Sequence, residues 1–142
     1  MCNLLVQNIK HTNNTTSMAI DTSGQVTIRG EGSATTTNLQ QGLAKSWSFY
    51  NQQTPATPDS FNTSSITDSS TGTYLVNFSN NHASTNYAAL GMALDIGQYY
   101  MHSNVRPTFS TSQYRVDTIR ADSVSTTHDA DDASNATLGD LA

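Results

Sequence analysis

TYLVNF, residues 73–78, is the stretch of this chain that most clearly predicts its fold. Successive side chains of a β-strand point to opposite faces, so Tyr74, Val76 and Phe78 share one face and the residues between them share the other. DSSTG at 68–72 is rich in turn-forming residues and directly precedes this stretch. The pattern predicts a strand with one core-facing side, entered through a tight turn.

Seven further short segments outside the N-terminal region have strand-like composition and lie between turn signals. They are residues 46–50, 61–66, 87–94, 98–101, 108–110, 114–119 and 137–141. Residues 51–59 contain two prolines and are predicted to be a polar loop. Residues 87–94, YAALGMAL, are small and apolar, which favours a strand buried on both faces, with a short helix as the alternative. The spacing predicts an antiparallel β-sandwich over residues 46–142.

The N-terminal residues 1–28 show a separate, weaker β pattern. An apolar stretch is followed by a hairpin in which Gly24 takes the positive-φ position of the turn. Such a small hairpin is not stable alone in water and needs another surface to pack on. Residues 29–45 have three glycines and few apolar side chains, which predicts a linker with a helical turn around residues 38–41.

The composition favours strands over helices. Ser, Thr and Asn occupy 52 of the 142 positions, and charged residues are only 12%, with a single Glu. Thr suits the pleated surface of a sheet, whereas a solvated helix needs many charged side chains. The hydrophobic fraction of 35% predicts a thin core for a monomer. Either much of the surface is Ser/Thr-rich strand, or apolar area is buried between chains. Because symmetric packing would cover apolar faces that one thin chain cannot cover, we predict a homotrimer.

Charge and apolar content argue against several classes of partner. The formal charge is −5, and the six Lys and Arg residues are scattered, which makes nucleic acid a poor partner. No stretch is long and apolar enough to span a bilayer, so membrane insertion is not expected. Cys2 is the single cysteine, which excludes an internal disulfide. No signal peptide is evident, and we expect synthesis in a cytoplasm and a soluble chain.

Two regions of the chain carry a resemblance to a known family. The N-terminal one is LLVQNI at 4–9 followed by MAIDTSGQV at 18–26. The other comprises KSWSFYN at 45–51, DSFNTSSITDSSTGTYLVNFS at 59–79 and NYAALG at 86–91. In this order they resemble the leader and the C-terminal β domain of marine bacteriophage tail-fibre and virion structural proteins. The gap between the two regions is shorter here than in that family, and residues after Asn104 match more loosely.

The resemblance implies a virion appendage, commonly trimeric, made in the bacterial host cytoplasm. It places the leader against other virion proteins of the tail, neck or capsid, so we assign Leu4, Val6 and Ile9 to attachment. The β domain would face outward and contact the host surface, either a glycan or a protein. Residues 99–102 are the predicted contact patch: Tyr99, Tyr100, Met101 and His102. Two alternatives stay open: a carbohydrate-binding host-recognition module and a ligand-free capsid or neck decoration protein.

Catalytic and metal-binding patterns are weak in this sequence. The four histidines are far apart, and no pair has the spacing of a zinc site, so we expect solvated or interface histidines. The acidic stretch 128–135 lacks the central Gly and final Glu of a calcium loop and is predicted to be solvated. Glu31 lies in the linker, and no nucleophile elbow is present. We therefore predict no enzymatic activity and no cofactor.

The aromatic cluster at 47–50 has two interpretations. Trp47, Phe49 and Tyr50 could stack on sugar rings, as exposed aromatic faces do. Alternating aromatics within a strand more commonly belong to a core, and the resemblance places Trp47 and Phe49 in a structural strand.

Overall fold

A computed structural model describes residues 7–10, 12, 15–29, 36–40, 42–95, 100–106, 108–120 and 126–142, with the backbone alone at 36–38 and 100–106. All regular elements among these residues are strands, and every pairing between them is antiparallel. The predicted all-β class is thus confirmed. The chain divides into two compact units, Met1–Leu43 and Ala44–Ala142.

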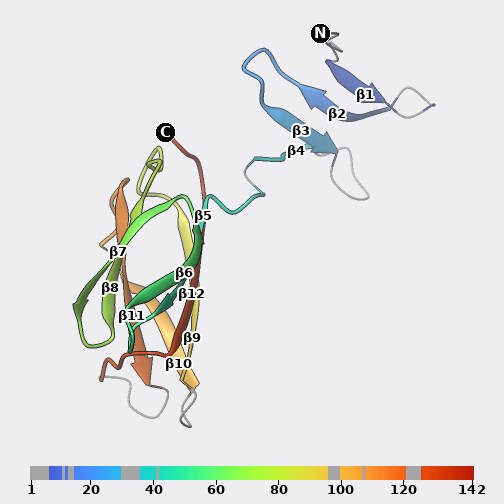
Figure 1. The fold of residues 1–142 in the computed structure, drawn as a ribbon. Helices are drawn as coiled ribbons and strands as arrows, with labels where there is room; N and C mark the ends of the chain where they lie inside the picture. Colours follow the sequence, from blue (N-terminus) through green and yellow to red (C-terminus); the bar gives the residue numbers. More distant parts are fainter. Residues whose placement is uncertain are drawn as a thin grey trace. The chain divides into compact units, whose positions relative to one another are not determined.

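The N-terminal unit is one four-stranded sheet in the order β1-β2-β3-β4 (Figure 1). Its strands are β1 (Asn8–Lys10), β2 (Thr16–Ile20), β3 (Val26–Arg29) and β4 (Thr36–Asn38). The predicted hairpin is present, with Gly24 at φ +78°. The Asp21 carboxylate accepts hydrogen bonds from the backbone N–H groups of Ser23 and Gln25 at 2.8 and 2.9 Å, which fixes the turn. Strand β4 falls within the segment that the sequence assigns to a linker.

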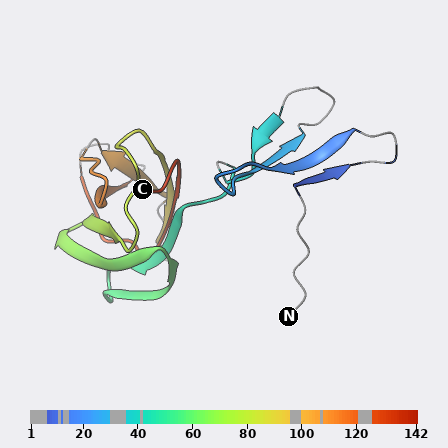
Figure 2. The ribbon, with the colours of Figure 1, turned by 90° about the horizontal axis from the view of Figure 1, so that it is seen from above.

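The C-terminal unit contains a single rolled sheet of eight strands in the order β6-β5-β12-β9-β10-β11-β8-β7. The strands are β5 (Ser46–Asn51), β6 (Ala56–Phe61), β7 (Thr63–Ser70), β8 (Thr73–Phe78), β9 (Ala88–Leu94), β10 (Tyr100–Arg106), β11 (Gln113–Arg120) and β12 (Asp132–Leu138). Strands β6-β5-β12-β9 form a first layer and β7-β8-β11-β10 a second layer around one interior (Figures 1 and 2). The unit is therefore sandwich-like.

Asn62 brings the two edges of the rolled sheet together. It is the one residue between the edge strands β6 and β7, and its φ of 53° lies in the left-handed region that Asn tolerates. The Asn62 side chain donates to the carbonyl oxygen of Lys45 at 2.9 Å and accepts from the backbone N–H of Asn80 at 2.7 Å. These bonds hold the corner at which the chain passes from the first layer to the second.

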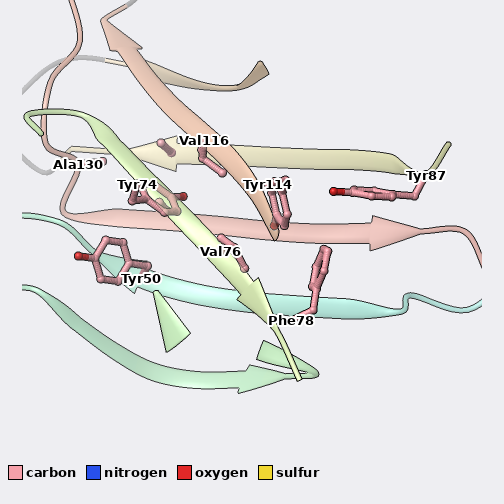
Figure 3. Close-up of a cluster of buried hydrophobic side chains, with 10 residues drawn as sticks. Tyr50, Tyr74, Val76, Phe78, Tyr87, Tyr114, Val116 and Ala130 are labelled. Atoms are coloured by element: carbon pink, nitrogen blue, oxygen red, sulfur yellow. The ribbon is translucent and has the colours of Figure 1, made fainter. Parts of the chain in front are cut away.

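The two layers contribute side chains of different size to the interior. Strands β8 and β11 contribute large ones, including Tyr74, Phe78 and Tyr114 (Figure 3). Apart from Tyr50 on β5, the buried residues of the first-layer strands are small or polar. These are Ser46, Ser48, Ala93, Ala133, Asn135 and Thr137. The inward positions of TYLVNF are thus Tyr74, Val76 and Phe78, as predicted.

Three segments differ from the sequence-based prediction. The expected loop 51–59 contains the start of β6, because Pro58 lies on an edge strand, where its missing N–H costs no sheet hydrogen bond. Residues 108–110 are not a strand. The expected acidic loop 128–135 overlaps β12, which pairs with both β5 and β9 in the middle of the first layer. Inward-facing Ala133, flanked by acidic and polar neighbours, anchors that strand in the core.

Candidate interaction surfaces

The outer surface of the first layer carries large apolar side chains, and we call it the apolar outer face. It comprises Trp47, Phe49, Phe61, Leu90, Met92, Leu94 and, between them, Ser134 and Ala136. The strand register aligns these residues in rows across the sheet. One row is Phe61, Trp47, Ala136 and Leu90, and the next contains Phe49, Ser134 and Met92.

The large side chains lie outside because rings from the second layer occupy the interior. In β9, Leu90, Met92 and Leu94 alternate with Ala and Gly, and Ala93 points into the core opposite tyrosine rings. The prediction that residues 87–94 form a strand is correct from Ala88 onward. The expectation that both faces are buried is wrong, because Met92 is 74% exposed and Leu90 58%.

Charged groups lie at the rim of the apolar outer face and not at its centre. Asp59 pairs with Phe49 on the edge strand β6, and Asp132 pairs with Leu94 at one end of β12. Between them the rows contain aromatic, aliphatic and small uncharged side chains. An apolar centre with a polar rim is the usual anatomy of a protein–protein interface.

The N-terminal sheet has a second uncovered apolar surface, which we call the N-terminal apolar face. Cross-strand pairing aligns Ile9 with Met18 and Met18 with Ile28, and pairs Ile20 with Val26. Because side chains alternate along a strand, these five residues share one face. None of the side chains described in this unit is fully buried, and Ile9 is 54% exposed. The sheet is therefore a single layer without a core of its own among its described residues.

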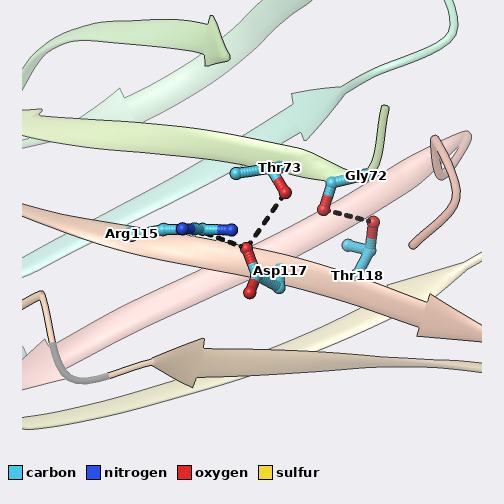
Figure 4. A network of polar contacts seen from close by, with 5 residues as sticks. All are labelled: Gly72, Thr73, Arg115, Asp117 and Thr118. Carbon is cyan, nitrogen blue, oxygen red and sulfur yellow. Dashed lines mark hydrogen bonds and ion pairs between the residues drawn. The ribbon is translucent and has the colours of Figure 1, made fainter. Parts of the chain in front are cut away.

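The second layer contains a cluster of polar contacts among buried and partly buried residues (Figure 4). On β11, the Arg115 guanidinium donates to the Asp117 carboxylate at 2.7 Å, and the Thr73 hydroxyl donates to the same oxygen at 3.0 Å. Asp117 is 1% exposed, and its charge is balanced by this ion pair. Nearby, the Thr118 hydroxyl and backbone N–H both donate to the carbonyl oxygen of Gly72. This cluster links β8 to β11 and has a structural role.

The structure covers the predicted contact patch only in part. Tyr99 lies outside the described residues. Tyr100, Met101 and His102 begin β10, which pairs with β9 and β11, and only their backbone is described. They belong to a strand inside the sheet, and their role as a contact surface stays a prediction.

The predicted attachment residues also fall largely outside the described residues. Leu4 and Val6 precede the first described position, whereas Ile9 lies on β1 and on the N-terminal apolar face. Of the aromatic cluster at 47–50, Tyr50 is buried in the core, while Trp47 and Phe49 point to the apolar outer face. The core interpretation of that cluster therefore holds for Tyr50 alone.

His82 is buried in the core, contrary to the expectation of solvated or interface histidines. It is 1% exposed, its ring stacks on Tyr87 with centroids 4.1 Å apart, and its Nε2 lies 3.1 Å from the Thr137 hydroxyl. Burial, with a smaller effect from the positive charge of Lys45, lowers the pKa of His82 below its usual value of 6.5. The neutral ring is thus a packing element of the core.

The acidic stretch 128–135 also makes more contacts with the rest of the unit than a solvated loop would. The Asp129 carboxylate accepts a hydrogen bond of 2.6 Å from the backbone N–H of Gly72, and Ala130 is fully buried. In the part of the chain that the structure describes, no group of three or more His, Cys, Asp or Glu side chains is arranged to hold a metal ion. The described residues also include no helix of the length and apolarity needed to cross a bilayer.

Comparison with protein-family models, with curated proteins and with solved structures finds no match.

The sequence-based prediction missed Phe61, Leu90, Met92 and Leu94 as surface residues. The signal for the last three is a size alternation in LGMAL at 90–94, with large side chains at every second position. Such alternation is typical of a strand with two different faces.

Proposed function

We propose that this chain is a non-enzymatic structural protein of a bacteriophage particle, a fibre-type appendage that attaches through its N-terminal unit. In this proposal residues 1–28 dock on other virion proteins, and the sandwich-like unit extends outward as a homotrimer and contacts the host surface. The resemblance of residues 4–26 and 45–91 to virion structural proteins is one basis. The second basis is that each unit has an uncovered apolar face.

The N-terminal apolar face is the observation that carries the proposal. A four-stranded sheet normally gains its stability by covering one apolar side. Here Ile9, Met18 and Ile28 form a row on one side, and none of them is buried. Such a sheet gains stability when another surface covers it, which is the behaviour expected of a docking segment.

Incorporation into particles tests this function. Met18→Glu places a charge in the middle of the N-terminal apolar face, and Thr27→Glu places the same charge on the opposite face, next to Ala19. We expect Met18→Glu to reduce the amount of this chain in purified particles at least tenfold, measured by quantitative mass spectrometry. Thr27→Glu should leave it within twofold. Wild-type chain absent from purified particles would disprove the proposed function.

A carbohydrate-binding host-recognition module is the second candidate, and the pairing of Trp47 with Phe61 favours it. These two aromatic side chains are direct cross-strand neighbours on β5 and β6 and are 39% and 52% exposed. Aromatic faces stack on the C–H surfaces of sugar rings. Glycan-array binding that Trp47→Ala abolishes, and that Tyr99→Ala and Tyr100→Ala leave intact, would support this site. Loss with the tyrosine variants would support the predicted patch at 99–102 instead.

A further inference from the structure

We propose that the apolar outer face of the first layer is covered by a second copy of this chain. The inference rests on the proposed function, in which copies of this chain assemble, and it names the surface through which they meet. It is carried by the charge, the area and the side-chain arrangement of that face, and none of these depends on the docking of the N-terminal unit.

The charge distribution of the apolar outer face favours a second copy of this chain as its partner. Two copies of a chain with a net charge of −5 repel one another except where they meet through uncharged surfaces. The rows through Trp47 and Met92 contain no Asp, Glu, Lys or Arg at their centre, and Asp59 and Asp132 lie at the rim. A basic partner would select a face with carboxylates, and an anionic membrane or nucleic acid would select cations. A neutral face fits a like-charged copy.

The exposed apolar area of this face matches what a stable protein–protein interface needs. Trp47, Phe61, Leu90, Met92 and Leu94 are 39%, 52%, 58%, 74% and 48% exposed. With about 150–250 Å² for a fully exposed aromatic side chain and somewhat less for Leu or Met, they offer roughly 500 Å² of apolar surface. A standard interface takes about 800 Å² from each partner, and roughly 56–65% of that area is apolar. The face thus supplies the apolar area that one side of a stable interface needs.

Large and small side chains alternate across this face in a way that suits packing against another sheet. Ala136 and Ser134 form a column of small side chains along β12, between the large side chains of β5 and those of β9. Sheets that pack face to face interdigitate large side chains with small ones at a separation of about 10 Å. The large side chains of one copy therefore fit above the small column of another.

Light scattering on the full-length chain tests the inference. Met92→Glu adds a charge at the centre of the face, and because Met92 is 74% exposed, the change should not unfold the chain. Ser69→Glu is the matched control, since Ser69 is an exposed strand residue on β7 in the second layer. Circular dichroism checks folding, and Met92→Ala replaces Met92→Glu if the charged variant is unfolded.

The inference predicts that wild type and Ser69→Glu have two or more times the 15.3 kDa mass of one chain at micromolar concentration. Met92→Glu should have the mass of one chain, or dissociate at a concentration at least tenfold higher than wild type does. A wild-type mass of 15.3 kDa at all concentrations up to the millimolar range would overturn the inference. So would an unchanged Met92→Glu assembly, or monomers that bind neutral phosphatidylcholine vesicles through this face. Normal incorporation of a monomeric chain into particles would leave the docking of the N-terminal unit standing and would refute the homotrimer.

Discussion

The Asn135 side chain donates a hydrogen bond of 2.7 Å from Nδ2 to the Tyr74 hydroxyl, across the interior from β12 to β8. Both residues are buried, and the bond joins the two layers at the point where a large side chain of one meets a small polar side chain of the other. Large rings from the second layer fill most of this interior, and apart from Tyr50 the first layer turns its larger apolar residues outward.

The tyrosine hydroxyls of the core should differ in their contribution to stability. Tyr74→Phe removes the acceptor of the Asn135 amide, so we expect the free energy of unfolding to fall by about 1–2 kcal/mol. Tyr114 provides the control, because its buried hydroxyl has no hydrogen-bond partner among the described residues. Tyr114→Phe should therefore be neutral or stabilising. Urea denaturation compares the three proteins, and equal losses in both variants would contradict the hydrogen-bond assignment.

Gly72 should tolerate a side chain far less well than Gly24. Both have positive φ, +67° and +78°, which costs a non-glycine residue about 1–2 kcal/mol. A Cβ at Gly72 would in addition overlap the backbone of Thr127 and His128, whereas nothing lies within 4 Å of a Cβ at Gly24. We expect Gly72→Ala to lower the free energy of unfolding by about 3 kcal/mol or more, and Gly24→Ala by about 1 kcal/mol. Similar effects at both sites in thermal unfolding would refute the packing at Gly72.

His82 should make the C-terminal unit less stable in mild acid. Its pKa in the folded chain is lowered from 6.5 by burial, so the unfolded chain takes up a proton first as the pH falls. The neutral His82 ring therefore stabilises the folded chain fully above about pH 6.5. This stabilisation is lost progressively as the pH falls below that value toward the folded pKa. The urea midpoint of wild type should decrease between pH 7.5 and 5.5. His82→Gln should show a smaller decrease, and an identical pH dependence would exclude His82 as the cause.

The N-terminal sheet should exchange its amide hydrogens faster than the C-terminal unit. Its described side chains are all at least partly exposed, whereas Tyr74, Val76 and Tyr114 anchor a buried core in the other unit. Exchange depends on local opening, which is easier where few apolar side chains are buried. Mass spectrometry should find strands β2 and β3 exchanging at least tenfold faster than β8 and β11 in the free chain. Equal protection of the two units would show that the N-terminal apolar face is already covered.

The sequence predicts the strands whose pattern is local. In TYLVNF, Tyr74, Val76 and Phe78 occupy alternate positions and face the core, as the period-two alternation predicts. The hairpin around Gly24 is likewise predictable, since its turn chemistry lies within a few residues. Strand β4 is not, because residues 36–38 pair with the free edge of β3 and have little apolar pattern of their own.

The sequence does not predict which side chains of the first-layer strands point outward, because this depends on the side chains of the opposite layer. The small residues of β9 suggest burial on both sides until the rings of Tyr74 and Tyr114 are placed across the interior. Strand β12 has the same problem: its acidic start resembles a loop, and the inward Ala133 and Asn135 become informative only when β8 lies across from them. The apolar outer face is therefore a consequence of packing between residues distant in sequence.

Fluorescence of Trp47, the single tryptophan of the chain, tests the central claim that the apolar outer face is covered by a second copy. In one free chain Trp47 is 39% exposed and should be quenched by acrylamide. Raising the protein concentration from nanomolar to the micromolar range should shift the emission to the blue and reduce the quenching constant at least twofold. Met92→Glu should keep the spectrum of the dilute chain throughout. Emission and quenching that do not change with concentration, in a chain shown to associate, would contradict the claim.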